Sequence, residues 1–448
     1  MKHKEEFCAN TAVHGFSQLK RFNTSLTQLC WTIFLCIMFI ILILHLCLIF
    51  VEYLKFGCHD KITLTYHSTF PEVIFCPLNS DYPKRLYFLR NTSNQAESEY
   101  WDIMYNDISI DDFLKTHASV NYSTPHLANT YYKSSVVKYA NLNSKQRKLL
   151  EQSPENLIVY AHYNGEPTNI SEFVSVPHPT YINCVKFIPP KWNTNSFELG
   201  LHTAVFLKDR EQTSPSTFQY VPQSSSYGMQ VILNEQNTQP NLDGEGFGIV
   251  VGHAVQVAVT QTEISRLGSP YSVCSDTFRY PDGNIGKYDA SLCYYICSQT
   301  KMLETCGCLY VGEKPWNIYD IPFCAQWQKN YTDMIKRVRC EAEMSHKVFR
   351  ICRCDLPCKE TKYAAKVSQT SWPLLSQVKS FVSLNIKNNS QHLRSLVKYL
   401  TNEEGLKDVD ESLFGSKEFF EHNQITDKAL QTWVQKHFIQ ISIFMPPE

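Results

Sequence analysis

One long apolar segment near the N-terminus dominates the hydrophobic pattern of the chain. Leu29 to Val51 is a run of 23 residues without a charged side chain, and 16 of them are Leu, Ile, Phe or Val. At about 1.5 Å per residue, a helix of this length spans roughly 34 Å, which is enough to cross a hydrocarbon core of about 30 Å. The segment therefore predicts a membrane-spanning helix at 29–51.

The alternative to a membrane helix is a cleaved signal peptide. The apolar core of a signal peptide is only about 7–15 residues long and is followed by a cleavage site of small residues. The run after Val51, Glu52-Tyr53-Leu54-Lys55-Phe56, contains no such site. We therefore prefer the membrane helix.

The charges that flank the apolar segment predict its orientation. Residues 1–28 carry four basic side chains and two acidic ones, and Lys or Arg next to a membrane helix favours the cytoplasmic side. This predicts a cytoplasmic N-terminus and an extracellular domain over 52–448. Sequons in that part supply candidate glycosylation sites, namely Asn91, Asn121, Asn169, Asn330 and Asn388.

Beyond Val51 the pattern alternates between strand and helix periods. Val255, Val257 and Val259 alternate with less apolar residues, as a strand with one buried face would, and Ile439, Ile441 and Ile443 repeat the pattern near the end. Further segments are a predicted strand over 62–76, a strand-rich region over 197–275, and predicted helices over 290–305, 325–345, 390–400 and 427–436. Strands interrupted by helices predict an α+β ectodomain.

Composition narrows the class of protein. The formal net charge is −1 over 448 residues, so nothing global favours nucleic acid. The 17 cysteines are a heavy load for a reducing compartment and suit an oxidising one. No sequence feature predicts a cofactor.

Ten of the cysteines crowd between Cys274 and Cys358 with near mirror symmetry. Two helices that run up and back would join them as nested rungs: Cys274–Cys358, Cys293–Cys354, Cys297–Cys352, Cys306–Cys340 and Cys308–Cys324. Ten cysteines allow about 945 pairings, so spacing alone leaves the connectivity open. Zinc modules usually show C-x2-4-C pairs, often with paired histidines. Here the gaps within the close pairs are three or one residues and the predicted compartment is oxidising, so we predict no metal site.

At these residues the chain resembles the degenerin / epithelial sodium channel / acid-sensing ion channel family. The cysteine spacing resembles the thumb region of that family, and further matches are spread over residues 10–375. They are His14-Gly15, Phe70-Pro71-Glu72-Val73-Ile74-Phe75-Cys76, Gly246-Phe247-Gly248-Ile249-Val250-Val251-Gly252, Pro270-Tyr271-Ser272-Val273-Cys274 and Cys352-Arg353-Cys354-Asp355-Leu356-Pro357-Cys358, followed by Tyr363, Ser368 and Trp372-Pro373.

The resemblance implies a hand-shaped ectodomain. Its parts would be a finger at about 95–150, palm strands at about 60–80, 197–272 and 438–446, a thumb at 274–358, and a helical knuckle-like region at about 372–436. It also implies a Cys76–Cys184 bridge. One family bridge is missing because no cysteine lies between Cys76 and Cys184, and Cys58 has no obvious partner.

The resemblance also implies a function. The chain would be a subunit of a trimeric, sodium-selective, amiloride-sensitive cation channel of the plasma membrane, in contact with membrane lipid and related subunits. The family's cytoplasmic His-Gly pair, which acts in gating, matches His14 and Gly15. Tyr271 falls where the family has an aromatic residue that contacts the membrane-proximal segment, here near Tyr53 or Phe56. That contact would couple thumb motion to the gate.

Charge in the thumb bears on what opens the channel. Residues 325–362 hold nine Lys or Arg and five Asp or Glu, a balance that keeps nearby carboxylates ionised and opposes proton sensing. The acidic stretch 97–112, with Asp107, Asp111 and Asp112, is either a solvated helix face or one wall of a cleft that binds a cationic peptide. We expect a ligand other than protons, and a peptide agonist is the class that the resemblance favours.

Two other classes share parts of this layout. No second long apolar stretch follows Val51, so we expect this chain to lack the pore helix of the family. A single-pass cell-surface binding or regulatory protein without conduction would share every extracellular feature. A type II membrane glycosyltransferase would share the anchor, and Asp408-Val409-Asp410 supplies a D-x-D, but no phosphate-binding loop accompanies it.

Overall fold

The computed structural model divides the chain into two compact units, each of which is described by itself. Unit 1 contains residues 1–64 and 267–273, and unit 2 contains 65–266 and 274–448. The described residues are 24–56, 61–63, 69–78, 153–178, 181–190, 200–207, 227–236, 238, 240, 245–279, 285–310, 321–324, 326, 331–386, 389–406, 409, 413 and 417–446.

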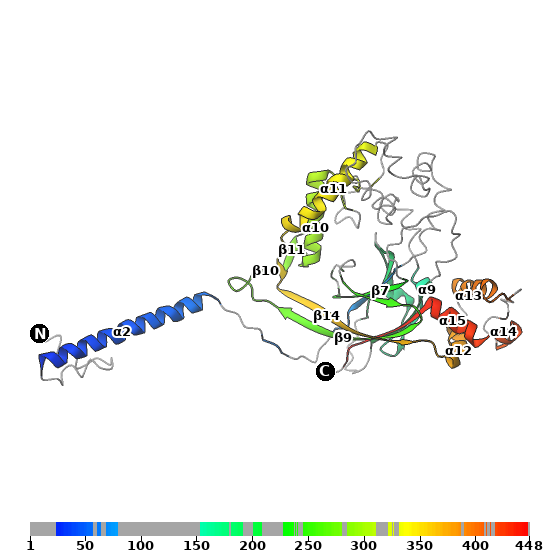
Figure 1. Ribbon diagram of the computed structural model, residues 1–448, viewed down its shortest axis with the longest axis horizontal. Helices are drawn as coiled ribbons and strands as arrows, with labels where there is room; N and C mark the ends of the chain where they lie inside the picture. Colours follow the sequence, from blue (N-terminus) through cyan, green and yellow to red (C-terminus); the bar gives the residue numbers. More distant parts are fainter. Residues whose placement is uncertain are drawn as a thin grey trace. The chain divides into compact units, whose positions relative to one another are not determined.

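Unit 1 is built on one long helix, α2 (Ser25–Leu54), drawn in blue in Figure 1. It contains the whole predicted membrane segment, and none of its residues is buried. Ile40 and Leu48 expose 56% and 67% of their surface, far more apolar area than water tolerates on one helix. Among the described helices, α2 is the one long and apolar enough to cross a membrane.

Unit 2 contains two main sheets. The five-stranded sheet has the order β4 (Phe173–His178), β5 (Ile182–Phe187), β1 (Glu72–Pro77), β7 (Gly228–Asn234) and β8 (Phe247–Val250). The six-stranded sheet has the order β14 (Lys359–Ser371), β9 (His253–Ser265), β15 (Phe438–Phe444), β6 (Gly200–Phe206), β2 (Ile158–Tyr163) and β3 (Glu166–Pro167). All of these pairs are antiparallel except β15 with β9.

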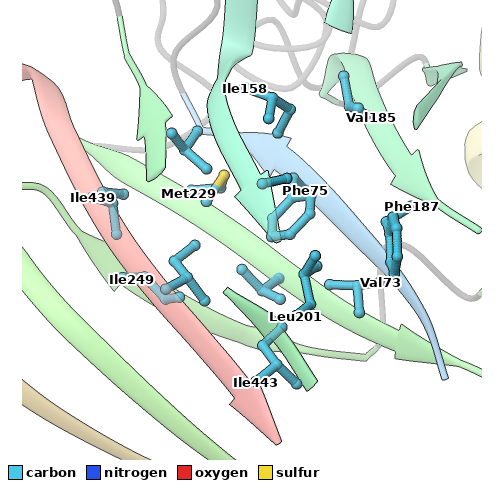
Figure 2. Close-up of a cluster of buried hydrophobic side chains, with 14 of the residues drawn as sticks. Val73, Phe75, Ile158, Val185, Phe187, Leu201, Met229, Ile249, Ile439 and Ile443 are labelled. Atoms are coloured by element: carbon cyan, nitrogen blue, oxygen red, sulfur yellow. The ribbon is translucent and has the colours of Figure 1, made fainter. Parts of the chain in front are cut away.

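The main hydrophobic core draws on strands of both sheets. Figure 2 shows Val73 and Phe75 of β1 gathered with Leu201 of β6 and with Ile439 and Ile443 of β15. The alternation in β9 is confirmed, because Val255, Val257 and Val259 are all at most 1% exposed. Over this stretch β9 buries one face, as the period of two requires, whereas β1 is buried on both faces.

Strand β15 divides its side chains between two cores. Ile439, Ile441 and Ile443 enter the core with the five-stranded sheet, whereas Phe438 packs into a second core with the C-terminal helices. Gln440 and Ser442 lie on the face opposite the isoleucines and are partly exposed. The predicted strand at 439–443 is therefore confirmed.

Four helices build the second core on one face of the six-stranded sheet. They are α12 (Val378–Asn385), α13 (Ser390–Asn402), α14 (Lys417–His422) and α15 (Asp427–His437), which gather in Figure 1. Asn389 caps α13 by accepting hydrogen bonds from the Gln391 and His392 amides, and Thr426 caps α15 by accepting one from Ala429. These caps satisfy backbone N–H groups that have no partner inside the helix.

The cysteine-rich region folds as a helix pair on short strands. Helix α10 (Ala290–Cys306) begins at the Asp289 cap and ends at Gly307, whose φ of 65° suits a residue without a side chain. Helix α11 (Tyr331–Ile351) lies beside it in Figure 1. Below them are β10 (Cys274–Ser275), β11 (Thr277–Arg279), β12 (Ile285–Lys287) and β13 (Leu356–Pro357).

Helix α11 begins and ends about six residues later than the 325–345 that the sequence predicts. Asp333 lies in its first turn and Arg350 in its last, so the charges complement the helix dipole at these ends. Three smaller elements complete the part of the fold that the structure describes: α9 (Pro154–Leu157), η2 (Ile170–Glu172) and η3 (Leu375–Gln377). The α+β class that the sequence predicts is correct.

His392 makes the second core sensitive to acid. It is 1% exposed and packs on Phe206, with ring centroids 4.3 Å apart, and its Nε2 donates to the Asn156 carbonyl at 3.1 Å. Burial lowers the pKa of His392 from 6.5 to about 4, although the hydrogen bond to Asn156 opposes the shift. The unfolded chain therefore takes up this proton at a higher pH than the folded chain does.

We expect His392→Phe to flatten the pH dependence of stability. Because the folded-state pKa is depressed, the wild-type protein loses stability as pH falls from 6.5 towards 4, by about 2 kcal/mol between pH 7 and pH 5. Thermal unfolding of the detergent-solubilised chain across this range should show a smaller loss in the variant. His253→Phe, at a partly exposed position, is the matched control for the replacement of a histidine by phenylalanine. An unchanged slope in His392→Phe would contradict the assignment.

Candidate functional site

Six disulfides staple unit 2. Five of them lie within residues 274–358, hereafter the thumb, and the sixth joins two strands of the five-stranded sheet. The pairs are Cys76–Cys184, Cys274–Cys358, Cys293–Cys354, Cys297–Cys352, Cys306–Cys340 and Cys308–Cys324. The thumb pairs are those of the nested arrangement. All ten thumb cysteines are thus used in disulfides, which leaves none of them for zinc.

We expect the disulfides to make the thumb a rigid body. Two rungs tie α10 to the segment that follows α11, with Cα–Cα distances of 6.0 Å for Cys293–Cys354 and 5.8 Å for Cys297–Cys352. A disulfide adds typically about 2–4 kcal/mol to folding stability by restricting the unfolded chain. A helix pair cross-linked along its length moves as one piece rather than bending internally.

The base of the thumb is fixed to the end of the long β9–β14 ladder. The Arg266 amide donates to the Cys358 carbonyl at 2.7 Å, next to the Cys274–Cys358 bridge. The Arg266 guanidinium donates to the Pro357 carbonyl at 2.6 Å and to a Glu360 carboxylate oxygen at 3.1 Å. Burial alone would raise the pKa of Glu360, but hydrogen bonds from Arg266 and Lys362 lower it, so this carboxylate stays ionised.

A second set of polar contacts ties the thumb base to the sheets. Lys287 of β12 lies 2.5 Å from a Glu235 carboxylate oxygen, and the Thr361 hydroxyl donates to the same oxygen at 3.0 Å. The Tyr288 hydroxyl donates to the Asp355 carbonyl at 2.7 Å. The Glu235 carboxylate, just past β7, thus contacts both Lys287 of β12 and Thr361 of β14. Displacement of the thumb base would strain these two contacts.

In unit 1, an aromatic contact joins the loop 267–273 to the end of α2. The Tyr271 and Phe56 rings meet edge to face, with centroids 5.6 Å apart and an interplanar angle of 84°. The centroids of the Tyr53 and Phe56 rings are 6.4 Å apart. The loop is closed by the Tyr271 amide, which donates to the Gly268 carbonyl at 3.0 Å, and by the Ser272 hydroxyl, which donates to the Leu267 carbonyl.

The backbone of Phe56 adopts an uncommon conformation. Its φ is 49°, in the left-handed region that a bulky residue rarely occupies. This is the position just past a helix end where glycine is common. A bulky residue held there in place of glycine is consistent with a role for its ring, which packs against Tyr271.

The remaining predicted site residues are only partly covered by the structure. Asn169 is described: it is exposed and precedes η2, where its side-chain oxygen accepts from the Ser171 amide at 3.2 Å. The other predicted sites lie outside the described residues, namely His14, Gly15, Cys58, Asn91, Asp107, Asp111, Asp112, Asn121, Asn330 and Asn388.

Some contacts could not be found from the sequence. Arg266 and Glu360 are 94 positions apart, and Glu235 and Lys287 are 52 apart, so no local pattern pairs them. The structure shows that the two ends of the thumb return to one place, and this brings Arg266 to Glu360. Among the described residues no group of three or more His, Cys, Asp or Glu could hold a metal ion.

These features define a class: a disulfide-rich domain that follows a membrane-helix candidate in the chain. Comparison with known proteins specifies the family. A model of the amiloride-sensitive sodium channel family matches residues 7–444. The chain belongs to this family, which consists of ion channels, so the glycosyltransferase alternative is excluded.

Curated relatives agree with the family. The degenerin mec-10 of Caenorhabditis briggsae is 25% identical over 257 residues, covering 54% of this chain and 33% of the relative. The epithelial sodium channel subunit beta of Homo sapiens is 28% identical over 252 residues, covering 51% and 36%. The subunit gamma of Rattus norvegicus is 30% identical over 169 residues, covering 36% and 25%. The matched part thus spans about a third or less of these relatives' length.

We expect Arg266→Met to loosen the thumb base. The change leaves the Pro357 carbonyl and the largely buried Glu360 carboxylate without their partner, which should cost about 1.5–3 kcal/mol of folding stability. Lys362→Met is the matched control, since Lys362 also contacts Glu360 at 2.9 Å but is 65% exposed. Surface pairs contribute roughly 0–1 kcal/mol, so the control should stay near wild type in thermal unfolding. Equal losses in both variants would contradict the assigned role of Arg266.

Proposed function

We propose that the chain forms one subunit of a sodium-selective cation channel of the plasma membrane. The subunit would assemble as a homo- or heterotrimer with related channel subunits, with its N-terminus in the cytoplasm and unit 2 outside the cell. Family membership over residues 7–444 supports the channel class. The charge asymmetry around the apolar segment supports the orientation.

The observation that carries the gating proposal is the contact between Phe56 and Tyr271. Tyr271 lies in the loop 267–273, which follows β9 and precedes β10 in the chain, and the disulfide at Cys274 begins one residue past this loop. Phe56 lies just past the end of α2. Movement of the rigid thumb would pull on the loop through this short connection, and the aromatic contact would pass the movement to the membrane helix.

The loop is short enough to transmit such movement. Its seven residues are closed internally by the Tyr271 amide and the Ser272 hydroxyl. At one end it follows Arg266, which is held by Pro357 and Glu360. A loop that is anchored at one end and hydrogen-bonded internally can change its length only a little. The thumb and α2 would therefore move together.

The test is a double-mutant cycle on channel currents. Phe56→Ala and Tyr271→Ala, made in the full natural coding sequence, should each shift the agonist response about 2- to 13-fold, since such a ring pair contributes about 0.5–1.5 kcal/mol. The double variant should shift no further than either single one, because both changes remove the same contact. Tyr271→Trp should retain coupling.

Additive shifts in that cycle would contradict the coupling between the two rings. Failure to record any sodium current from a surface-expressed wild type, alone or with related subunits, would favour the non-conducting cell-surface protein instead. Block of the current by amiloride would agree with the family.

The agonist is proposed to be an extracellular cationic peptide. The acidic stretch 97–112 would supply carboxylates against the basic thumb sequence, whose charge opposes proton sensing. The double change Asp111→Asn and Asp112→Asn should lower apparent agonist affinity, as expected when charge partners of a bound cation are removed. Dose–response curves with candidate peptides and with acid provide the measurement. Unaltered curves, or activation by acid alone, would contradict this proposal.

A further inference from the structure

A polar cluster on the face of the six-stranded sheet that also carries the helical layer contains two histidines at directly opposite positions. His162 of β2 and His202 of β6 are directly opposite in the antiparallel ladder. Side chains at such positions point to the same face, with Cβ atoms about 4.5–5.5 Å apart. Both imidazoles are partly exposed. Two accessible imidazoles at this spacing can reach one ion.

The third residue of the cluster is Tyr160. Its ring centroid lies 5.7 Å from that of His162 and 5.7 Å from that of His202, so the three rings form one group. Its hydroxyl lies 3.3 Å from Nε2 of His202 and accepts a hydrogen bond from the Gln440 side-chain amide at 3.1 Å. The Tyr160 hydroxyl is therefore free to donate its own proton to His202.

The hydrogen bonds around His202 assign its tautomer. Two donors approach Nε2, namely the Tyr160 hydroxyl and the Gln440 amide, both at 3.3 Å. Nε2 is thus the unprotonated nitrogen, and Nδ1 donates to the Ser442 hydroxyl oxygen at 2.6 Å. A metal-bound histidine generally donates its other ring N–H to a fixed acceptor in this way.

The lone pair on Nε2 of His202 accepts only long, weak hydrogen bonds. Hydrogen bonds at 3.3 Å are long, since strong ones that involve a hydroxyl lie nearer about 2.7–2.8 Å. The imidazole of His162 makes no hydrogen bond to any described residue. Two imidazole nitrogens can therefore be turned towards an ion without the loss of a strong contact.

We propose that His162 and His202 form a binding site for a transition-metal dication, with Zn²⁺ as the representative ion. Imidazole is the protein ligand that such ions favour, and water would occupy the remaining coordination positions. The Tyr160 hydroxyl would hydrogen-bond to one of these waters. With two protein ligands the site is a modest one, suited to reversible binding rather than to a permanent structural ion.

Electrostatics agree with this assignment. Burial lowers the pKa of His202, and the neighbouring His162 lowers it further, so the imidazole is neutral at physiological pH. A neutral imidazole binds a metal without first losing a proton. Burial also raises the pKa of Tyr160, so the phenol stays protonated and acts as a hydrogen-bond donor rather than as a ligand.

The test uses the whole chain in detergent and Zn²⁺ alone. Histidines are carbethoxylated with diethyl pyrocarbonate, with and without zinc, and each site is quantified by peptide mass spectrometry. Free zinc at about ten times the dissociation constant should slow modification of both His162 and His202 about tenfold, because about one-tenth of the sites stay empty. His253 is the internal control: it lies opposite Ser371 rather than another histidine, so its rate should not change.

Two variants test whether both histidines bind the same zinc ion and whether the Ser442 hydrogen bond supports that binding. His162→Asn should abolish zinc protection at His202, because one imidazole alone binds weakly. Ser442→Ala should weaken zinc binding about tenfold or more by releasing Nδ1 of His202. Equal modification with and without zinc, or protection of His202 that persists in His162→Asn, would overturn the shared site. The assay reads no current, so its result is independent of the proposed channel function.

Discussion

The thirteen-residue pairing of β9 with β14 is the constraint on which the rest of unit 2 depends. Its register runs from His253 opposite Ser371 to Ser265 opposite Lys359. At the first end, Gly252 accepts a hydrogen bond from the Trp372 amide and donates one to the Phe438 carbonyl, where the helical layer begins. At the other end the Cys274–Cys358 bridge closes the thumb. One rigid ladder therefore connects the helical core to the thumb base.

The two ends of this ladder are stabilised differently. The helical end is a large apolar core in which Trp433, Phe419 and Phe438 are fully buried. The thumb end relies on disulfides and on ion pairs that involve Glu235 and Glu360. Apolar cores resist small displacements, whereas a hinge held by a few polar contacts can exchange partners. This contrast favours the thumb base as the place where unit 2 moves.

Much of this architecture could be predicted from the chain itself, because the signals were local. The apolar run that became α2, the alternating valines of β9 and the isoleucines of β15 each report a period that burial imposes. The mirrored cysteine spacing suggested the nested pairing but left the connectivity open, and the structure supplies it. The polar junctions could not be predicted: Arg266 and Glu360, or His162 and His202, meet only because distant strands share one register, which no short pattern encodes.

In the proposed gating, the loop 267–273 and the end of α2 move as one. A cross-link that makes their contact permanent tests this: Phe56→Cys with Tyr271→Cys in the full natural coding sequence, with currents recorded before and after mild oxidation. Oxidation should change the agonist-evoked current, a reductant should restore it, and neither single variant should respond. A cross-link verified by mass spectrometry that leaves the current unchanged would show that the two segments do not move together.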